Sequence, residues 1–232
     1  MHLACSQYNS PNEAVNFDLN CIFIAVPKTG TTTVRSQVRS LGPFMIDNPH
    51  LSLAQIQSIL YPYILKCNLG RNCNFPAPRE LATDRDVREH AIELFSTMFK
   101  FGSVRNPWAR MFSMYRRKEG VQVSSQIPFS EFINNIQYAS DTCLHPLKMA
   151  SQLDWFRDKK GKIAMDYIFK LEEIEKAIEQ IEEMSNGRIT IQNKKKNVNP
   201  QSASYKDAYT QKEVKIVERL FQEEIEYLGY TF

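Results

Sequence analysis

The chain has 232 residues and a mass of 26.9 kDa, with 43% hydrophobic and 24% charged residues. This composition is that of a soluble globular protein able to bury a sizeable core, and it excludes wholesale disorder and collagen-like structure. The net charge of +3 and the pI near 8.5 are too mild to indicate nucleic acid as the main partner, so any basic site must be local.

The apolar runs and the cysteines of the sequence indicate the cellular location of the protein. The longest apolar run, residues 21–26, is far shorter than the roughly 20 residues that span a bilayer, and the N-terminus lacks the pattern of a secretory signal. We therefore expect a cytoplasmic protein without a membrane partner, or a catalytic domain cut from its anchor. Five cysteines are an odd number in a chain of this size, which favours reduced thiols, although Cys67 and Cys73 could pair.

The first half of the chain predicts one strand, one loop and three helices. Residues 1–20 are polar and predict a loosely held lead-in to a single domain at 21–232. The run CIFIAVP, residues 21–27, is apolar on both faces, as in a buried parallel strand. A helix with Val34, Val38 and Leu41 on one face follows the threonines. Residues 42–97 predict an insertion facing the acceptor, with helices at 51–65 and 84–99.

The second half repeats the order of strand, turn and helix. A buried strand is predicted to end at Arg105, and Pro107 suits the first position of the next helix. The pattern then predicts a short helix at 127–137, a third strand at 162–169, and helices at 171–184 and from a Thr210–Glu213 capping box to about 228. This alternation predicts a P-loop-like three-layer α/β sandwich whose central parallel sheet is flanked by helices. Ligands would bind at the carboxyl ends of the strands.

The first candidate site is PKTGTTT, residues 27–33, between the first strand and its helix. A helix N-terminus offers unpaired N–H groups to an anion, Gly30 lets a backbone approach closely, and Lys28 supplies a mobile charge. A hydroxyl-capped turn is the structural alternative. The segment is not a Walker A loop, because its lysine precedes the glycine, and no carboxylate for Mg²⁺ follows a later strand. A metal-free transfer, for which sulfuryl groups are suited, is therefore expected.

The second candidate site is SVRNPWARMFSMYRR, in which Arg105 ends a strand and Ser113 follows eight positions later. Eight residues are about two helical turns, so both side chains could reach one anion. An arginine fork suits phosphate oxygens and the serine adds a hydroxyl donor. Alternatively, Arg105 caps a neighbouring helix and Ser113 is a small interior residue, but the order of the two segments favours a shared site.

These two segments resemble the nucleotide-dependent sulfotransferases, in particular the carbohydrate branch called sulfotransferase family 2. AVPKTGTTT is similar to the family's 5′-phosphosulfate-binding loop, and VRNPWARMFSMYRR to its 3′-phosphate-binding segment. Two weaker likenesses follow, in DKKGKIAMDYIFKLEEIEK and in the C-terminal YKDAYTQKEVKIVERLFQEEIEYLGYTF. The resemblance covers residues 21–41 and about 98–232, while 42–97 match poorly.

The resemblance implies a donor, 3′-phosphoadenosine 5′-phosphosulfate (PAPS), bound without metal and released as the bisphosphate PAP. The residues that would hold its 5′-phosphosulfate are Lys28, Thr29, Gly30, Thr31, Thr32 and Thr33. Arg105 and Ser113 would hold the 3′-phosphate, and the lysine-rich stretch 194–199 could fold over the adenosine or simply be solvated. The acceptor would be a hydroxyl or amine of a sugar or small natural product. Lys28 would stabilise charge on the leaving oxygen.

A general base should remove the proton of the acceptor, and here the sequence departs from the family. The register places a family histidine near Leu81, where this chain has none. The substitutes are His90, Glu80 and His50. His90 ranks first by residue type, because a neutral imidazole accepts a proton near neutral pH; an ordinary helix position is its alternative. His145, which could line the acceptor pocket, and His2 rank below these three.

The missing histidine leaves two competing functions open. A non-catalytic module of the same fold would bind the nucleotide without turnover, and a small P-loop kinase would need Mg²⁺ and ATP. A nitrogen acceptor, which could react without a base, would also explain the departure. The sequence does not determine the oligomeric state.

Overall fold

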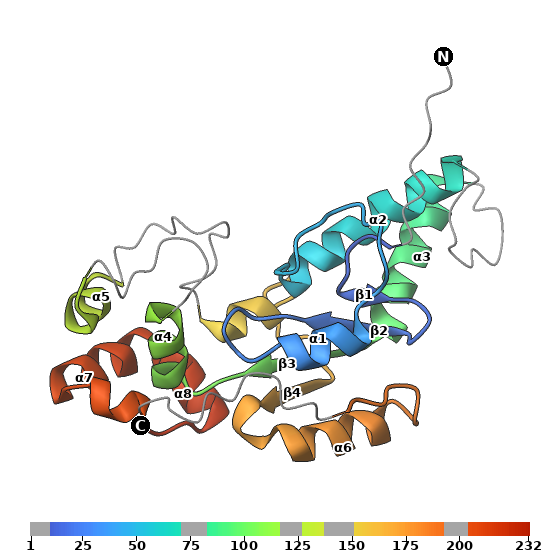
Figure 1. Ribbon diagram of the computed structural model, residues 1–232. Coiled ribbons are helices and arrows are strands. Elements are labelled where there is room, and N and C mark those ends of the chain that lie inside the picture. The colour runs from blue at the N-terminus through green and yellow to red at the C-terminus, as the bar shows by residue number, and fades with distance from the viewer. Residues whose placement is uncertain (1–9, 71–82, 117–126, 137–150, 193–203) are drawn as a thin grey trace.

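The computed structural model describes residues 10–70, 83–116, 127–136, 151–192 and 204–232 (Figure 1). These residues contain a four-stranded sheet in the order β1-β2-β3-β4. Its strands are β1 (Val15–Asn16), β2 (Cys21–Ile24), β3 (Phe99–Val104) and β4 (Tyr167–Lys170). Strands β2, β3 and β4 are parallel, and β1 runs antiparallel to β2. The three predicted strands are confirmed as parallel, and β1 makes the sheet mixed.

The helices follow the strands in the predicted alternation. Three helices lie between β2 and β3 in the chain: α1 (Thr32–Val38), α2 (Leu53–Gly70) and α3 (Asp84–Thr97). Those after β3 are α4 (Pro107–Tyr115), α5 (Phe129–Asn135), α6 (Ile174–Met184), α7 (Gln211–Leu220) and α8 (Gln222–Leu228). Short 3₁₀ turns are η2 (Gln152–Phe156), η3 (Leu171–Glu173) and η4 (Tyr205–Ala208).

Strand β2 and the residues after it divide the core into two layers. Cys21, Phe23 and Ala25 pack with α1 and α6, through residues such as Val34 and Ile181. The alternate residues Ile22, Ile24 and Val26 pack with α2 and α3, through Ile56, Leu60 and Val87 among others. Successive strand side chains point to opposite faces, so the sheet is covered by helices on both sides (Figure 1). The narrower description as a P-loop-like three-layer sandwich stays a prediction.

Helices α4, α5, α7 and α8 form a separate group beside the end of β3, from which the chain runs into α4 (Figure 1). Asn106 caps α4 by accepting hydrogen bonds from the N–H groups of Trp108 and Ala109, and Pro107 takes the first helical position as predicted. The predicted capping box of α7 is also present, because the Glu213 carboxylate accepts a bond of 2.6 Å from the N–H of Thr210.

Several predicted strand limits differ in the structure. β2 stops at Ile24, before Pro27, and β3 ends at Val104 rather than Arg105, whose backbone bonds to the Gln152 side chain instead. The third strand begins at Tyr167, because Ile163 instead forms an antiparallel bridge with Arg157 around a tight turn.

The prediction of a loosely held lead-in is wrong for the described residues 10–20. Ser10, Asn12 and Glu13 are buried, and β1 lies in the sheet. Polar composition misled here because these side chains bond to the protein itself: the Ser10 hydroxyl donates to the carbonyls of Asn12 and Val15, and the Asn12 amide to those of Ile46 and Asn48.

The expectation of reduced thiols is wrong for Cys67, which is disulfide-bonded. Cys21 is a free, buried thiol, and Cys73, with which Cys67 could pair, lies outside the described residues. Cys67 sits near the end of α2, where the sequence offered no pattern to distinguish a paired cysteine from a buried one. The thiol argument for a reducing compartment therefore fails, and a cytoplasmic location stays a prediction.

Candidate functional site: two loops at the carboxyl ends of β2 and β3

The loop between β2 and α1 contains two residues in the left-handed backbone region, Lys28 (φ 68°) and Gly30 (φ 70°). The second position requires glycine for two reasons. An L side chain is strained at that φ, and a Cβ atom there would lie 2.4 Å from Cδ1 of Leu171, which follows β4. The loop therefore turns tightly against the residue that follows β4, two strands away from β2 in the sheet, and Lys28 is half-buried on this loop.

The threonines of this loop have different environments. Thr29 is fully buried, its hydroxyl donates to the carbonyl of Val26 at 2.9 Å, and it lies 2.8 Å from the hydroxyl of Ser103 on β3. Its side chain thus ties the loop to β3, so any contact with an anion falls to its backbone. Thr31 is buried, makes no side-chain capping bond, and precedes α1, on which Thr32 is exposed and Thr33 half-buried.

Arg105 directly follows β3 and reaches the first loop. Its Nη1 donates to the carbonyl of Lys28 at 3.4 Å, so the structure brings the two predicted anion-binding segments together. Burial lowers the pKa of the Arg105 guanidinium, and the nearby Glu172 carboxylate opposes that shift. Glu172 in turn accepts bonds from the Asn106 N–H at 2.8 Å and the Tyr230 hydroxyl at 3.1 Å, so the surroundings of Arg105 are held from the C-terminal segment.

A second arginine, Arg110 on α4, contacts the loop between β2 and α1. It is completely buried on α4, and its Nε donates to the carbonyl of Pro27 at 3.2 Å. Burial lowers its pKa, and the charge of Glu224 acts in the opposite direction. Sequence analysis missed this residue. Its position between Pro107 and Met114, at helical spacing on the buried face of α4, was the available signal.

Ser113 lies half-buried on α4. Among the described residues, it makes no hydrogen bond to Arg105 or to the loop 27–33. Its role at a 3′-phosphate therefore stays a prediction. The stretch 194–199, which could cover the adenosine, lies outside the described residues.

The candidate bases are placed differently from the predicted ranking. His90 sits in the middle of α3, beside Glu93 with 3.6 Å between Nδ1 and the carboxylate. Because α3 leads into the start of β3, it lies toward the amino ends of the strands, away from Lys28 and Arg105. Glu80, His2 and His145 lie outside the described residues.

His50 is the histidine that the structure brings to the loop. Its Nδ1 lies 2.8 Å from the carbonyl of Ala25, the residue after β2, so Nδ1 carries the proton and donates it to that carbonyl. Its ring packs edge-on against Trp155 with 6.4 Å between centroids. The sequence alone ranked His90 first, because the 25 positions between His50 and Ala25 hid this contact.

Within the described residues, no group of three or more histidine, cysteine and acidic side chains is arranged to hold a metal ion. Of the helices that the structure describes, none combines the length and apolarity that a bilayer crossing needs.

The comparisons with known proteins give one match. The model of the sulfotransferase family, family 2, matches residues 14–231, nearly the whole chain. No curated protein and no solved structure matches significantly. The match includes residues 42–97, where the motif resemblance was poor, and it spans both strand-end loops. The chain belongs to the sulfotransferase family.

Proposed function

We propose that this protein transfers a sulfuryl group from PAPS to a hydroxyl or amine of a sugar or small natural product, without a metal ion. The observation that carries the proposal is the 3.4 Å contact between the Arg105 guanidinium and the Lys28 carbonyl. This contact joins, at one edge of the sheet, the two segments that resemble the family's phosphosulfate and 3′-phosphate sites. Family membership supports sulfuryl transfer in general, while the donor and the acceptor class are our proposals.

The residues present fit such a donor by their chemistry. Lys28 and Arg105 are two cationic residues that follow β2 and β3 at one edge of the sheet, and a nucleotide with anionic groups at both ends needs two cationic positions. Lys28 and the backbone of residues 29–33 would hold the 5′-phosphosulfate. Arg105, with Ser113, would hold the 3′-phosphate. The bound donor supplies the sulfuryl group and a phosphate leaving group.

Lys28 and His50 are the two residues that act in the transfer step itself. The Lys28 ammonium stabilises negative charge on the leaving phosphate oxygen, a form of preorganised electrostatic catalysis. With Nδ1–H bonded to the Ala25 carbonyl, His50 carries its lone pair on Nε2, the atom that would accept the proton of the acceptor. His50 replaces His90 as the favoured base because it contacts the donor loop and His90 does not.

The experiment measures transfer from labelled PAPS to a panel of sugars and phenols, and binding of adenosine 3′,5′-bisphosphate by calorimetry, both with a chelator present. Lys28→Ala should lower kcat by a factor of about 10² to 10³. Arg105→Ala should weaken bisphosphate binding about tenfold to a hundredfold, the effect of a charge-assisted hydrogen bond. His50→Gln should lower kcat while leaving bisphosphate affinity unchanged.

Arg88→Ala on the surface of α3 is the control, and it should behave as the parent protein does. Unchanged bisphosphate affinity in Arg105→Ala would contradict the donor site. Binding without turnover for any acceptor would favour the non-catalytic module. A requirement for Mg²⁺ with ATP as donor would favour the kinase.

A further inference from the structure

The side chain of Gln152 makes two hydrogen bonds to the backbone of Arg105, one as acceptor and one as donor. Its Oε1 accepts from the Arg105 N–H at 2.8 Å and its Nε2 donates to the Arg105 carbonyl at 2.8 Å. Gln152 is completely buried. Because β3 ends at Val104, this amide takes the place that a neighbouring strand would occupy for one more residue. The direction in which Arg105 leaves the sheet is therefore fixed by Gln152.

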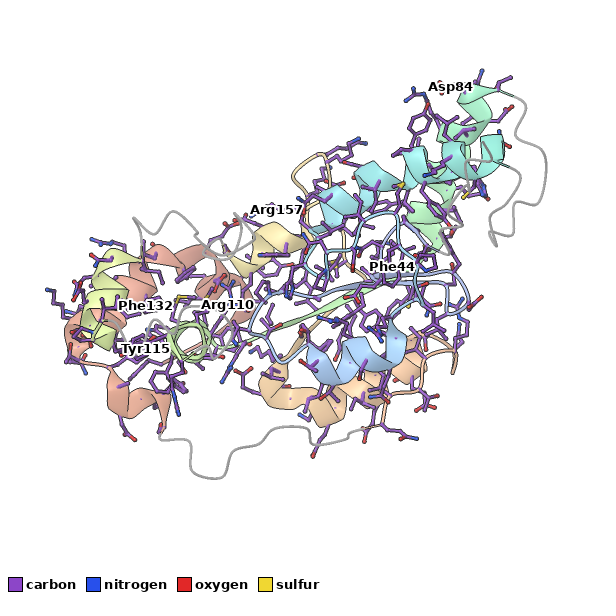
Figure 2. All side chains as sticks on the ribbon, turned by 45° about the horizontal axis from the view of Figure 1, so that its top comes forward. Phe44, Asp84, Arg110, Tyr115, Phe132 and Arg157 are labelled. Atoms are coloured by element: carbon purple, nitrogen blue, oxygen red, sulfur yellow. The ribbon has the colours of Figure 1, made fainter. Side chains whose placement is uncertain are left out.

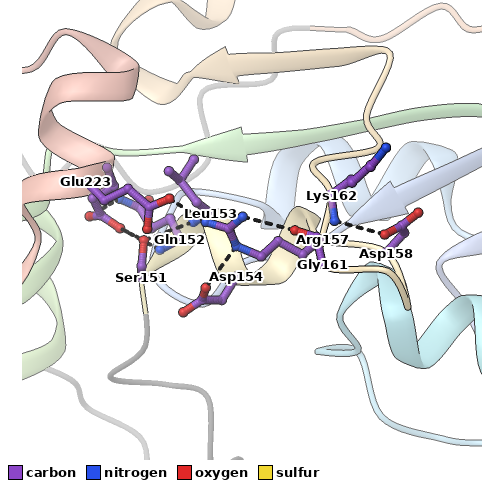
Figure 3. A network of polar contacts seen from close by, with 10 residues as sticks. Ser151, Gln152, Leu153, Asp154, Arg157, Asp158, Gly161, Lys162 and Glu223 are labelled. Atoms are coloured by element: carbon purple, nitrogen blue, oxygen red, sulfur yellow. Dashed lines mark hydrogen bonds and ion pairs between the residues drawn. The ribbon is translucent and has the colours of Figure 1, made fainter.

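Gln152 is itself held by Glu224 of α8, a completely buried carboxylate. Glu224 accepts from the Gln152 N–H, from its Nε2 at 3.0 Å, and from the Ser151 hydroxyl at 2.8 Å. The preceding carboxylate, Glu223, pairs with Arg157 just after η2 (Figure 3). Two adjacent residues of α8 thus hold η2 at both ends. A buried carboxylate with three donors leaves its partners little freedom to move.

Three residues after Gln152, the same turn contacts His50. Trp155 is completely buried and presents the edge-on contact with the His50 ring at an interplanar angle of 85°. In a 3₁₀ turn, side chains three positions apart lie on the same side. One short segment therefore contacts both Arg105, on the donor side, and His50, the favoured base.

We propose that η2 is a positioning element that sets Arg105 and His50 relative to each other. Gln152 acts through Arg105 on donor affinity, and Trp155 acts through His50 on proton transfer. This inference rests on the proposed function, since it assigns η2 a task in that reaction. Neither residue is a catalytic residue, because each acts through another side chain.

The first experiment separates the two halves of η2. Gln152→Leu removes both bonds that hold the Arg105 backbone. The Kd for adenosine 3′,5′-bisphosphate should then rise about tenfold, the effect of losing one well-formed hydrogen bond between Arg105 and the nucleotide. Trp155→Phe should leave this Kd unchanged, but should lower kcat and move the acidic limb of its pH profile.

Gln57→Leu is the matched control, because the Gln57 amide accepts a bond of 2.9 Å from the Lys159 N–H in the turn after η2 without contacting Arg105 or His50. It should leave both bisphosphate affinity and the pH profile unchanged. Thermal unfolding of each variant shows whether it is folded at the assay temperature.

A second experiment tests the hydrogen-bond pattern by rescue. Gln152→Glu loses the donor to Arg105 and brings two carboxylates together, so bisphosphate affinity should fall further than in Gln152→Leu. Adding Glu224→Gln restores a donor between the two side chains and should recover part of the loss. A merely space-filling role predicts no such recovery.

Hydrogen exchange of the unmutated protein tests the same coupling should the variants not fold. Adding adenosine 3′,5′-bisphosphate should slow exchange in residues 152–156, as well as in 27–33. If the unmutated protein neither binds the bisphosphate nor transfers sulfate, the proposed function fails. If it does both, but Gln152→Leu keeps the parent Kd or exchange in 152–156 is unaffected, the assignment of η2 fails alone.

Discussion

At the carboxyl ends of β2 and β3 the charged side chains are buried or half-buried, whereas along α3 they lie mostly on the surface. Arg110 and Glu224 are completely buried among the first group. On α3, the pairs Arg85–Glu89 and Arg88–Asp84 are largely exposed, although both have 2.7 Å between nitrogen and oxygen. Figure 2 labels Arg110 and Asp84, which lie far apart in the molecule.

The difference teaches which charges determine geometry. A buried charge is costly unless it is paired and hydrogen-bonded, so it fixes the position of every partner. An exposed pair stays solvated and contributes little. At the strand ends, buried charges therefore lower the stability but hold the loops in a defined geometry. α3 is stabilised instead by its apolar face, on which Val87, Ala91 and Phe95 are buried.

The strongest way to break the buried side of this comparison is Arg110→Met. It removes the positive charge that acts on the buried Glu224 and the bond from Arg110 Nε to the Pro27 carbonyl, and we expect the free energy of unfolding to fall by about 3 kcal/mol. Urea unfolding followed by circular dichroism measures this change. Adding Glu224→Gln should restore part of the stability, and a loss below about 1 kcal/mol in the single variant would show that the network is not a stabilising unit.

A smaller effect is expected from Gly30→Ala. The new Cβ combines left-handed strain with a contact to Leu171, and we expect a loss of about 2 kcal/mol together with weaker bisphosphate binding. Gly187→Ala is the matched control: it has a similar φ of 75° with nothing within 4 Å of the new Cβ, so it should lose only about 1 kcal/mol. Equal losses in the two variants would remove the argument from Leu171.

Cys21, at the amino end of β2, tests a buried group that carries no charge. Burial raises the pKa of its thiol to about 12 from 9.0, so the reactive thiolate is scarce at neutral pH. At pH 8, iodoacetamide should label Cys21 in denaturant and not in the folded protein, as peptide mass spectrometry would show. Because the folded state holds this proton more tightly, its contribution to the free energy of unfolding should fall as the pH rises from 9 to 12.

The smallest effect is expected on the exposed side. Arg85→Ala removes a pair with an 84% exposed arginine side chain, and the midpoint of urea unfolding should not change measurably. The pKa of Arg85 is raised by its bond to Glu89, but solvent and salt screen this interaction. A marked shift of the midpoint would mean that α3 depends on its surface charges after all.

The alternation of apolar runs and amphipathic stretches was enough to predict the parallel strands and most helices, because burial on both faces leaves a local signature. The limits of β4 and the place of residues 10–20 were not predictable in this way. Ile163 pairs with Arg157 instead of extending β4, and Asn12 is buried by bonds to residues more than thirty positions away.

The same division holds for the site. The short motifs around Lys28 and Arg105 were recognisable because each is contiguous and carries its chemistry in adjacent residues. The base and the supporting network were not, since the contacts of His50, Gln152 and Glu224 that matter here span 25, 47 and 72 positions of sequence.

The sequence by itself determined the strand-loop-helix units, the family resemblance and the two anion-binding segments, because these depend on periodicity and on neighbours along the chain. Only the tertiary structure decided that Arg105 reaches the Lys28 carbonyl, that His50 rather than His90 lies at the loop, and that a 3₁₀ turn supports both. These contacts are set by the hydrogen bonds that buried polar groups must make. The partners in such bonds can lie at any separation in the sequence, so a local pattern does not predict them.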